Sequence, residues 1–250
     1  MNISGIHIDN VSFQYGVGGY ELDGITTTIP AGSFCGITGV NGSGKTTFTY
    51  LLNGLIPHQI EGKLAGDVYV DGINTRSKPV SFFSRKVGLV FQNPDFMIFN
   101  LTVREEIAFG LTNLGLDRAN ERVNTSLTAV GLEGYEDRDP HMLSLGQKQK
   151  LAIAIVLAMD MQYIVLDEPS AMLDYRSAVE LYNLLKKLNK QGKTIIVVEH
   201  DTDFLLTYAD NMVVLDNGSC LLQGSTSKVF NEKTQLHTMG IKIPRRISYE

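Results

Sequence analysis

Eight consecutive residues near the start of the chain combine glycines with a lysine and a threonine in an order that suits phosphate binding. The stretch Gly39-Val40-Asn41-Gly42-Ser43-Gly44-Lys45-Thr46 has the pattern G-x-x-x-x-G-K-T. Its glycines allow a tight curl of the backbone, whose N–H groups then point at one anion. Lys45 would reach the β- and γ-phosphates and the Thr46 hydroxyl would ligate Mg²⁺. The stretch predicts an ATP site, to which we add the next residue, Thr47.

A pair of carboxylates is the second group that could do chemistry. Asp167-Glu168 follows the apolar run of residues 163–166. Asp167 would hold Mg²⁺ directly or through water, and Glu168 could orient or deprotonate an attacking water. Acidic pairs after strands are common, so the pair is informative because a phosphate loop accompanies it.

Gln92 and His200 occupy the same kind of position, each directly or closely after an apolar strand pattern. Ligands of open α/β sheets bind at the carboxyl ends of the strands. A hydrogen-bonded structural histidine in a loop is the alternative for His200. Four strand ends would deliver one set of polar side chains to one edge: Lys45, Thr46, Gln92, Asp167, Glu168 and His200.

Tyr15 lies at the end of an alternating apolar pattern. It is either a half-buried strand residue or an aromatic face on which adenine stacks, and its position alone favours neither interpretation.

The elements that must position these residues alternate along the chain. Strands are expected at residues 3–15 (with a slip near Asn10), 24–29, 34–37, 67–70, 87–91, 163–166, 194–198, 212–215 and 219–222. Helices are expected at residues 45–53, 80–84, 102–111, 118–130, 145–159, 176–189 and 204–208. Buried strands that alternate with helices indicate an α/β fold with a mainly parallel sheet covered on both faces. Residues 54–66 are expected to be irregular.

The chain is predicted to form one nucleotide-binding domain at residues 1–224, of the phosphate-loop NTPase type, with N-terminal antiparallel strands. Three successive helices without a convincing strand between them indicate an inserted helical subdomain at about residues 95–151. Residues 225–250 are expected to form a docked helix and a tail with Arg245-Arg246.

Composition narrows the class of protein. The 250 residues are 43% hydrophobic and 20% charged, and the net charge of −5 argues against nucleic acid as the main partner. No apolar run approaches the length of a spanning helix, and residues 1–4 lack a signal-peptide profile. Cys35 and Cys220 make no disulfide framework, and no Cys/His spacing indicates zinc. We therefore expect a cytoplasmic chain that does not cross a membrane by itself.

The stretch Leu143-Ser144-Leu145-Gly146-Gln147-Lys148-Gln149 resembles the L-S-G-G-Q signature of ATP-binding-cassette (ABC) ATPases. The resemblance covers essentially the whole chain. It implies that Tyr15 is the adenine-stacking aromatic, Gln92 the glutamine-loop residue and a Mg²⁺ ligand, and His200 the switch histidine. Because cassettes of this family meet head to tail, it also implies a second ATPase chain, identical or paralogous. The signature residues Ser144, Leu145, Gly146 and Gln147 would then act in trans, and Asp174 would contact the other chain.

Two positions depart from the family pattern. Leu145 replaces the first glycine after the signature serine, and Tyr175 follows Asp174 where proline is frequent. A side chain at position 145 could crowd the approach to the γ-phosphate and weaken binding in trans. Glu168 is intact, so the site is not expected to be inactive.

Finer resemblance is to the ATPases of energy-coupling-factor importers for cobalt, nickel or vitamins. It rests on residues 52–58 and on Gln92-Asn93-Pro94-Asp95 with Ile98-Phe99. It implies ATP and Mg²⁺ as cofactors, a transmembrane coupling subunit and a substrate-binding membrane subunit as partners, and a peripheral position at the cytoplasmic face of the cell membrane. His58 fits as loop structure without a metal role.

Other ABC ATPases are the alternatives. DNA-repair cassettes usually carry long coiled coils or zinc modules, ribosome-associated cassettes usually come in pairs within one chain, and exporter halves are usually fused to membrane helices. This sequence does not identify the transported substrate, because the resemblance implies that a separate membrane subunit binds it.

The segment between Gln92 and the inserted helices is rich in apolar residues, with Phe96, Met97, Ile98 and Phe99 in succession. Residues gathered this densely are expected to be buried against something. They pack beneath the helical subdomain, or they form a groove for an amphipathic helix of the membrane partner.

Overall fold

The computed structural model of the chain describes residues 4–245, so Arg246 of the predicted tail lies outside the described residues. Within that range the strands form two sheets. The smaller sheet has the order β2-β1-β4-β5 and is antiparallel throughout. Its strands are β1 (Gly5–Gln14), β2 (Leu22–Pro30), β4 (Lys63–Val70) and β5 (Ile73–Asn74). The expected slip near Asn10 is present, because the register of β1 shifts between Ile8 and Val11.

The larger sheet has the order β10-β9-β3-β8-β7-β6. All its neighbouring strands are parallel except β9 and β10. The fold is therefore the expected α/β architecture, a mainly parallel sheet accompanied by N-terminal antiparallel strands. The strands are β3 (Phe34–Gly39), β6 (Val87–Val90), β7 (Tyr163–Asp167), β8 (Thr194–Val198), β9 (Asn211–Asp216) and β10 (Ser219–Ser225).

Both faces of the central strands are buried, which explains their continuous apolar sequences. In β8, Ile195 and Val197 belong to a core shared with helices α6 (Leu145–Ala158) and α7 (Tyr175–Lys190). Ile196 and Val198 point the other way, into a core shared with helix α1 (Lys45–Leu52) and the antiparallel sheet. The sheet thus lies between two apolar cores, which fix the positions of its strands.

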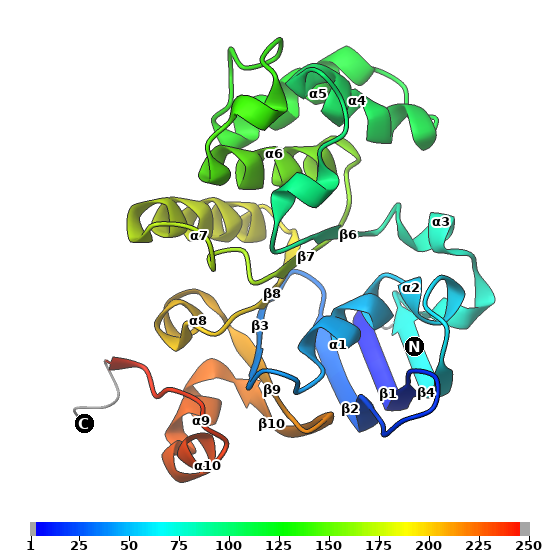
Figure 1. Cartoon of the computed structure of the whole chain (residues 1–250), viewed down its shortest axis with the longest axis vertical. Helices are drawn as coiled ribbons and strands as arrows, with labels where there is room; N and C mark the ends of the chain where they lie inside the picture. Colours follow the sequence, from blue (N-terminus) through cyan, green and yellow to red (C-terminus); the bar gives the residue numbers. More distant parts are fainter. Residues whose placement is uncertain (1–3, 246–250) are drawn as a thin grey trace.

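Helices α4 (Val103–Asn113), α5 (Ala119–Val130) and α6 follow one another between β6 and β7 and gather at one end of the molecule (Figure 1). The predicted capping box at the start of α4 is present, since Thr102 and Glu105 exchange hydrogen bonds. The core on the α6 side of the sheet continues into these helices through Val103, Ile107 and Leu127. The helical insertion is therefore joined to the sheet by a shared apolar core.

Two sequence-based expectations were wrong. Residues 54–66 are not irregular throughout, because helix α2 (Leu55–His58) forms there and β4 begins at Lys63, where it pairs with Gln14 of β1. The expected single helix after residue 225 is two short helices, α9 (Thr226–Asn231) and α10 (Lys233–Thr238). Both are docked through Phe230 and Leu236, which share a small core with α8 (Thr202–Tyr208) and β9.

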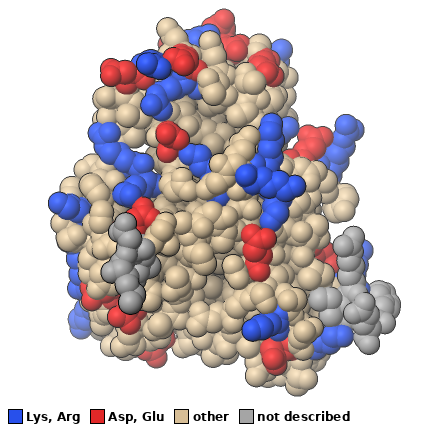
Figure 2. Space-filling model, turned by 180° about the vertical axis from the view of Figure 1, so that it is seen from behind, with Lys and Arg blue, Asp and Glu red and all other residues tan. Residues whose placement is uncertain are grey.

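The remaining elements are helix α3 (Val80–Phe83) and the short 3₁₀ turns Thr75–Ser77, Pro94–Met97 and Pro140–Met142. No helix in the described range is both long enough and apolar enough to span a bilayer. On the face shown in Figure 2, Lys and Arg side chains form several groups, with acidic and uncharged surface between the groups.

Candidate functional site

The neighbouring strands β3, β8, β7 and β6 run parallel, so their carboxyl ends meet at one edge of the sheet. Each strand is followed by residues that the sequence singled out. Lys45 and Thr46 open α1 after the loop that follows β3, and His200 lies two residues after β8. Asp167 ends β7 and Glu168 comes directly after it, and Gln92 lies two residues after β6. This edge is where ligands bind in open α/β sheets.

The loop from Gly39 to Gly44 needs its glycines for two reasons. Gly42 and Gly44 have positive φ angles of 78° and 94°. A Cβ on Gly44 would also lie 2.6 Å from the carbonyl oxygen of Glu21, and a Cβ on Gly39 would collide with the carbonyl oxygen of Leu215. The loop leads directly into α1, whose first turn adds N–H groups and a positive dipole end. Backbone and helix together form a cradle for an anion.

Lys45 lies at the mouth of this cradle. Its Nζ donates to the carbonyl oxygens of Gly39 and Val40 at 3.0 and 2.9 Å, and the residue is only 6% exposed. Burial lowers the pKa of Lys45, while the nearby carboxylates of Glu168 and Asp167 oppose that shift. The ammonium group is thus held between the loop and two acidic residues, where it can reach a phosphate.

Thr46 and Asp167 form the part of the site that suits Mg²⁺. The Thr46 hydroxyl donates to Oδ2 of Asp167 at 3.1 Å. Burial raises the pKa of Asp167, and the hydrogen bond from Thr46 opposes this. Mg²⁺ prefers oxygen ligands and is usually held by one or two carboxylates together with phosphates and waters. The adjoining hydroxyl and carboxylate offer that kind of donor set.

Glu168 connects two other predicted residues. Its Oε2 accepts a hydrogen bond from Nε2 of Gln92 at 3.1 Å, and its Oε1 lies 3.0 Å from Nε2 of His200. Its φ of 46° is in the left-handed region, which costs a residue other than glycine about 1–3 kcal/mol. The backbone is held there by the hydrogen bond from Glu168 N to the carbonyl of Val198. Such strain is typical of functional positions.

His200 is therefore not an isolated loop histidine, because its ring contacts Glu168 at the site edge. Gln92 reaches the site through Glu168, and its amide oxygen is the atom able to ligate a cation.

Tyr15 combines both interpretations of its position. Its ring meets Phe13 edge-on at 4.8 Å, and its hydroxyl lies 3.1 Å from Oγ1 of Thr47. The residue is 37% exposed, which leaves part of the ring uncovered beside α1. The ring is anchored in the fold and also has a free surface next to the phosphate loop.

A cavity of about 310 Å³ lies over the phosphate loop, a size typical of small-molecule sites. It is lined by Glu21, Asn41, Gly42, Gly44, Lys45, Thr46, Thr47 and Glu168. Glu21 was missed by sequence reasoning, since it sits at the end of a glycine-containing turn with no motif around it.

The signature residues do not line this cavity. Ser144 caps α6, and it exchanges hydrogen bonds with Gln147 in a capping box. Leu145 is half-buried in the first turn of α6. A Cβ on Gly146 would lie 3.6 Å from Ser177, which hydrogen-bonds Asp174 at the start of α7. The starts of α6 and α7 therefore place the signature and Asp174 next to each other, apart from the phosphate loop.

Two contacts that sequence reasoning missed join α6 to the segment after β6. Nε2 of Gln149 donates to the backbone carbonyl of Gln92 at 3.1 Å, and Nζ of Lys148 lies 2.7 Å from Asp95. Nothing in the sequence marks them, because both pairs are more than fifty residues apart. The helix that begins with the signature is thereby tied to the backbone of Gln92.

The apolar segment after Gln92 is divided between two environments. Ile98 is 5% exposed and Met97 packs against the core, whereas Phe96 and Phe99 are 69% and 74% exposed. Leu101 is exposed as well. Part of the segment thus packs beneath the helices, and part faces outward.

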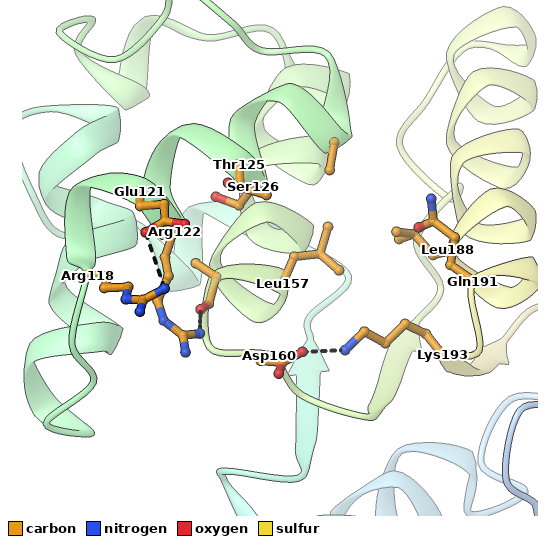
Figure 3. Close-up of a pocket in the computed structure, with 12 residues that line it drawn as sticks. Arg118, Glu121, Arg122, Thr125, Ser126, Leu157, Asp160, Leu188, Gln191 and Lys193 are labelled. Atoms are coloured by element: carbon orange, nitrogen blue, oxygen red, sulfur yellow. Dashed lines mark hydrogen bonds and ion pairs between the residues drawn. The ribbon is translucent and has the colours of Figure 1, made fainter.

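A second cavity lies between α5, the end of α6 and the end of α7 (Figure 3). Its basic side chains already have acceptors: Arg122 donates to the carbonyl of Ala158 at 2.9 Å, and Lys193 pairs with Asp160 at 2.9 Å. None of the predicted site residues lines this cavity, so we assign the chemistry to the edge of the sheet.

Comparison with known proteins finds relatives over nearly the whole chain. The family model described as ABC transporter matches residues 22–171. An ABC transporter ATP-binding protein of Pyrococcus abyssi is 48% identical over 99% of this chain and 89% of its own length. The energy-coupling factor transporter ATP-binding protein EcfA of Methanocaldococcus jannaschii is 39% identical over 96% and 86% of the two chains.

Among solved structures, cbiO1 of Clostridium perfringens is 33% identical, with a TM-score of 0.82 and 96% of both chains covered. That protein is described as part of the ABC transporter complex cbiONQ.

Proposed function

This chain belongs to the ABC transporter family, whose ATP-binding subunits bind and hydrolyse ATP, and from this premise we propose that it powers an energy-coupling-factor importer. The cargo would be a metal cation such as cobalt or nickel, or a vitamin. The similarity to EcfA and to cbiO1 supports this choice among ABC transporters. The observation that carries the ATPase part of the proposal is the contact of Glu168 with both Gln92 and His200, beside the Thr46–Asp167 pair.

The proposed chemistry follows from that geometry. Glu168 takes a proton from the attacking water, because its carboxylate is the acceptor at the centre of the group. His200 holds Glu168 through Nε2. Gln92 orients the same carboxylate and offers its amide oxygen to the cation. Thr46 and Asp167 would hold Mg²⁺, which would neutralise the negative charge that develops on the phosphates.

Binding of the nucleotide is assigned to the residues around the phosphate loop. The backbone of residues 39–46 holds the phosphates together with Lys45, and Thr46 and Asp167 hold Mg²⁺. Thr47 and Tyr15 lie at the adenine side, where the uncovered part of the tyrosine ring is available for stacking.

A second ATPase chain would complete the site. The signature at the start of α6 lies outside the cavity of its own phosphate loop, so a partner chain is required for the signature to reach a nucleotide. Asp174 lies beside the signature and would make contact in the same interface.

The membrane subunits would dock beside Gln92, at the outward-facing residues Phe96, Phe99 and Leu101. The chain would then lie peripherally at the cytoplasmic face of the cell membrane, bound to a transmembrane coupling subunit and, through it, to a substrate-binding subunit.

Isolation of the native complex tests this proposal. We expect membrane chains to co-purify with this chain, and we expect reconstituted vesicles to take up labelled cobalt, nickel or a vitamin only when ATP is present on the side of the ATPase. A Lys45→Ala complex, which keeps the subunits but lacks the phosphate ligand, is the control. A native complex without any membrane chain, or uptake that does not depend on ATP, would contradict the proposed role.

A further inference from the structure

Glu199 is a buried carboxylate that the proposed chemistry does not use. It follows β8 directly, precedes His200 and is 3% exposed. Its Oε1 accepts hydrogen bonds from the backbone N–H groups of His200 and Asp201, at 2.8 and 3.1 Å. Its Oε2 accepts from the hydroxyls of Ser170 and Tyr182, at 2.5 and 2.8 Å. Each carboxylate oxygen therefore has two donors.

These donors come from separate parts of the site. His200 and Asp201 belong to the loop after β8, and Ser170 lies two residues beyond Glu168 in the loop that leads to Asp174. Tyr182 belongs to α7, and its ring stacks on Phe204 of α8 with centroids 4.5 Å apart. Glu199 thus joins the two catalytic loops to each other and to the helices behind them.

The chemistry of the group explains why a carboxylate is needed here. A buried carboxylate is unfavourable unless hydrogen bonds replace its water. The four donors are two backbone amides and two hydroxyls, and an ionised carboxylate is the side-chain group that accepts from all four at once. Burial and the neighbouring Glu199 raise the pKa of Tyr182 well above its ordinary value, so its hydroxyl remains a donor.

We propose that Glu199 is a positioning residue for ATP hydrolysis, which fixes the loop of His200 against the loop of Glu168. The contact between Nε2 of His200 and Oε1 of Glu168 spans these two loops. Glu199 accepts from the backbone N–H of His200 on one side of it and from the side-chain hydroxyl of Ser170 on the other. This inference rests on the proposed roles of Glu168 and His200. Glu199 itself acts through them without touching the nucleotide.

The expected defect is therefore in turnover rather than in binding. The phosphate loop and Tyr15 belong to other segments, so Glu199→Ala should leave the Kd for ATP within about twofold. Misplacement of a catalytic pair by a fraction of an ångström should lower kcat by about 10- to 100-fold. Glu199→Gln should recover much of that loss, because its amide oxygen still accepts from both backbone N–H groups while the two hydroxyls reorient.

Asn189→Ala is the matched control for a buried hydrogen-bonding side chain. Asn189 is 8% exposed and donates to the carbonyls of Gly32 and Lys193, which precede β3 and β8 at the opposite edge of the sheet. It should lower the Tm without a specific loss of kcat at temperatures where the variant is folded.

The experiment measures kcat, KM, ATP Kd and Tm of the full chain, and records the His200 ring in a long-range ¹H–¹⁵N spectrum. Glu199→Ala should move the His200 Nε2 signal, and Asn189→Ala should leave it in place. An unmoved His200 signal, or a kcat loss no larger than in Asn189→Ala, would overturn the proposal.

Two further variants cover the case in which Glu199→Ala does not fold. Ser170→Ala and Tyr182→Phe each remove one donor and keep the carboxylate, and each should lower kcat by about 2- to 10-fold and shift the His200 signal. If neither variant does so, the proposal is wrong. Glu168→Gln and His200→Ala test the proposed function separately. If these two variants retain full turnover, the roles assigned to Glu168 and His200 are wrong. The His200 signal in the Glu199 variants still reports on positioning by Glu199 in that case.

Discussion

Replacement of Tyr15 by alanine should weaken ATP binding by an amount that the structure allows us to calculate. The residue is 37% exposed, and a tyrosine has about 200 Å² of surface to bury, so roughly 75 Å² remains for adenine to cover. At about 25 cal/mol per Å², covering that area contributes about 2 kcal/mol. A single base–aromatic stack contributes about 1–3 kcal/mol, in agreement with this value. The Kd for ATP should therefore rise about 30-fold in Tyr15→Ala.

Tyr15→Phe should have almost no effect on binding. The ring remains for stacking, and the hydroxyl hydrogen-bonds Thr47 of the protein itself. Loss of that hydrogen bond should lower the free energy of unfolding by about 1 kcal/mol while the Kd changes less than about twofold.

Isothermal titration with ATP measures both variants, in a Glu168→Gln background that limits hydrolysis. Tyr69→Ala on β4 is the matched control, because this half-buried ring lies over His7 of the antiparallel sheet and has no assigned contact with nucleotide. The reasoning is refuted if Tyr15→Phe weakens binding as much as Tyr15→Ala, or if Tyr69→Ala does so too.

Three further predictions concern catalysis, docking and acid stability. Glu168→Gln should lower turnover by about two to four orders of magnitude, and an ATP-bound dimer of this variant should accumulate in size-exclusion chromatography. Full activity of a strictly monomeric wild-type sample at high dilution would contradict the proposal that the signature acts in trans. Phe96→Asp should abolish transport and co-purification with the membrane subunits, while Tm and basal ATPase stay unchanged. Ile98→Asp changes a buried neighbour for comparison and should lower Tm. Survival of transport in Phe96→Asp would show that the docking surface lies elsewhere. Burial would raise the pKa of Asp71, but hydrogen bonds from Lys86, Tyr163 and Gly5 outweigh it and hold the pKa below its ordinary value. The stabilisation from Asp71 is therefore present above about pH 4 and lost as pH falls through the folded pKa. Asp71→Asn should be about 2 kcal/mol less stable to urea than the wild type at pH 7, and this difference should be smaller at pH 3. An equal difference at both pH values would show that the charge is not responsible.

The parts of the site that lie in contiguous segments could be predicted from sequence. The phosphate loop, the capped start of α4 and the strand that ends in Asp167-Glu168 each depend on interactions within a few residues. Turn conformations need glycine at particular positions, caps bond to the backbone three residues away, and buried strands need consecutive apolar side chains. These requirements leave a local pattern in the sequence, so the motifs and most strands and helices can be predicted from the sequence alone.

The meeting of the separate segments was decided by tertiary structure. Gln92, Glu168 and His200 touch because β6, β7 and β8 are neighbours in a sheet whose order differs from the order along the chain. The same holds for Glu199, whose hydroxyl donors come from a different loop and from α7. The early start of β4 at Lys63 likewise depends on pairing with β1. Long-range hydrogen bonds require only a donor and an acceptor in the right place, so they impose no periodicity on the sequence. Nothing in the sequence around Ser170, Tyr182 or Glu199 therefore marks these residues as partners until the sheet brings them together.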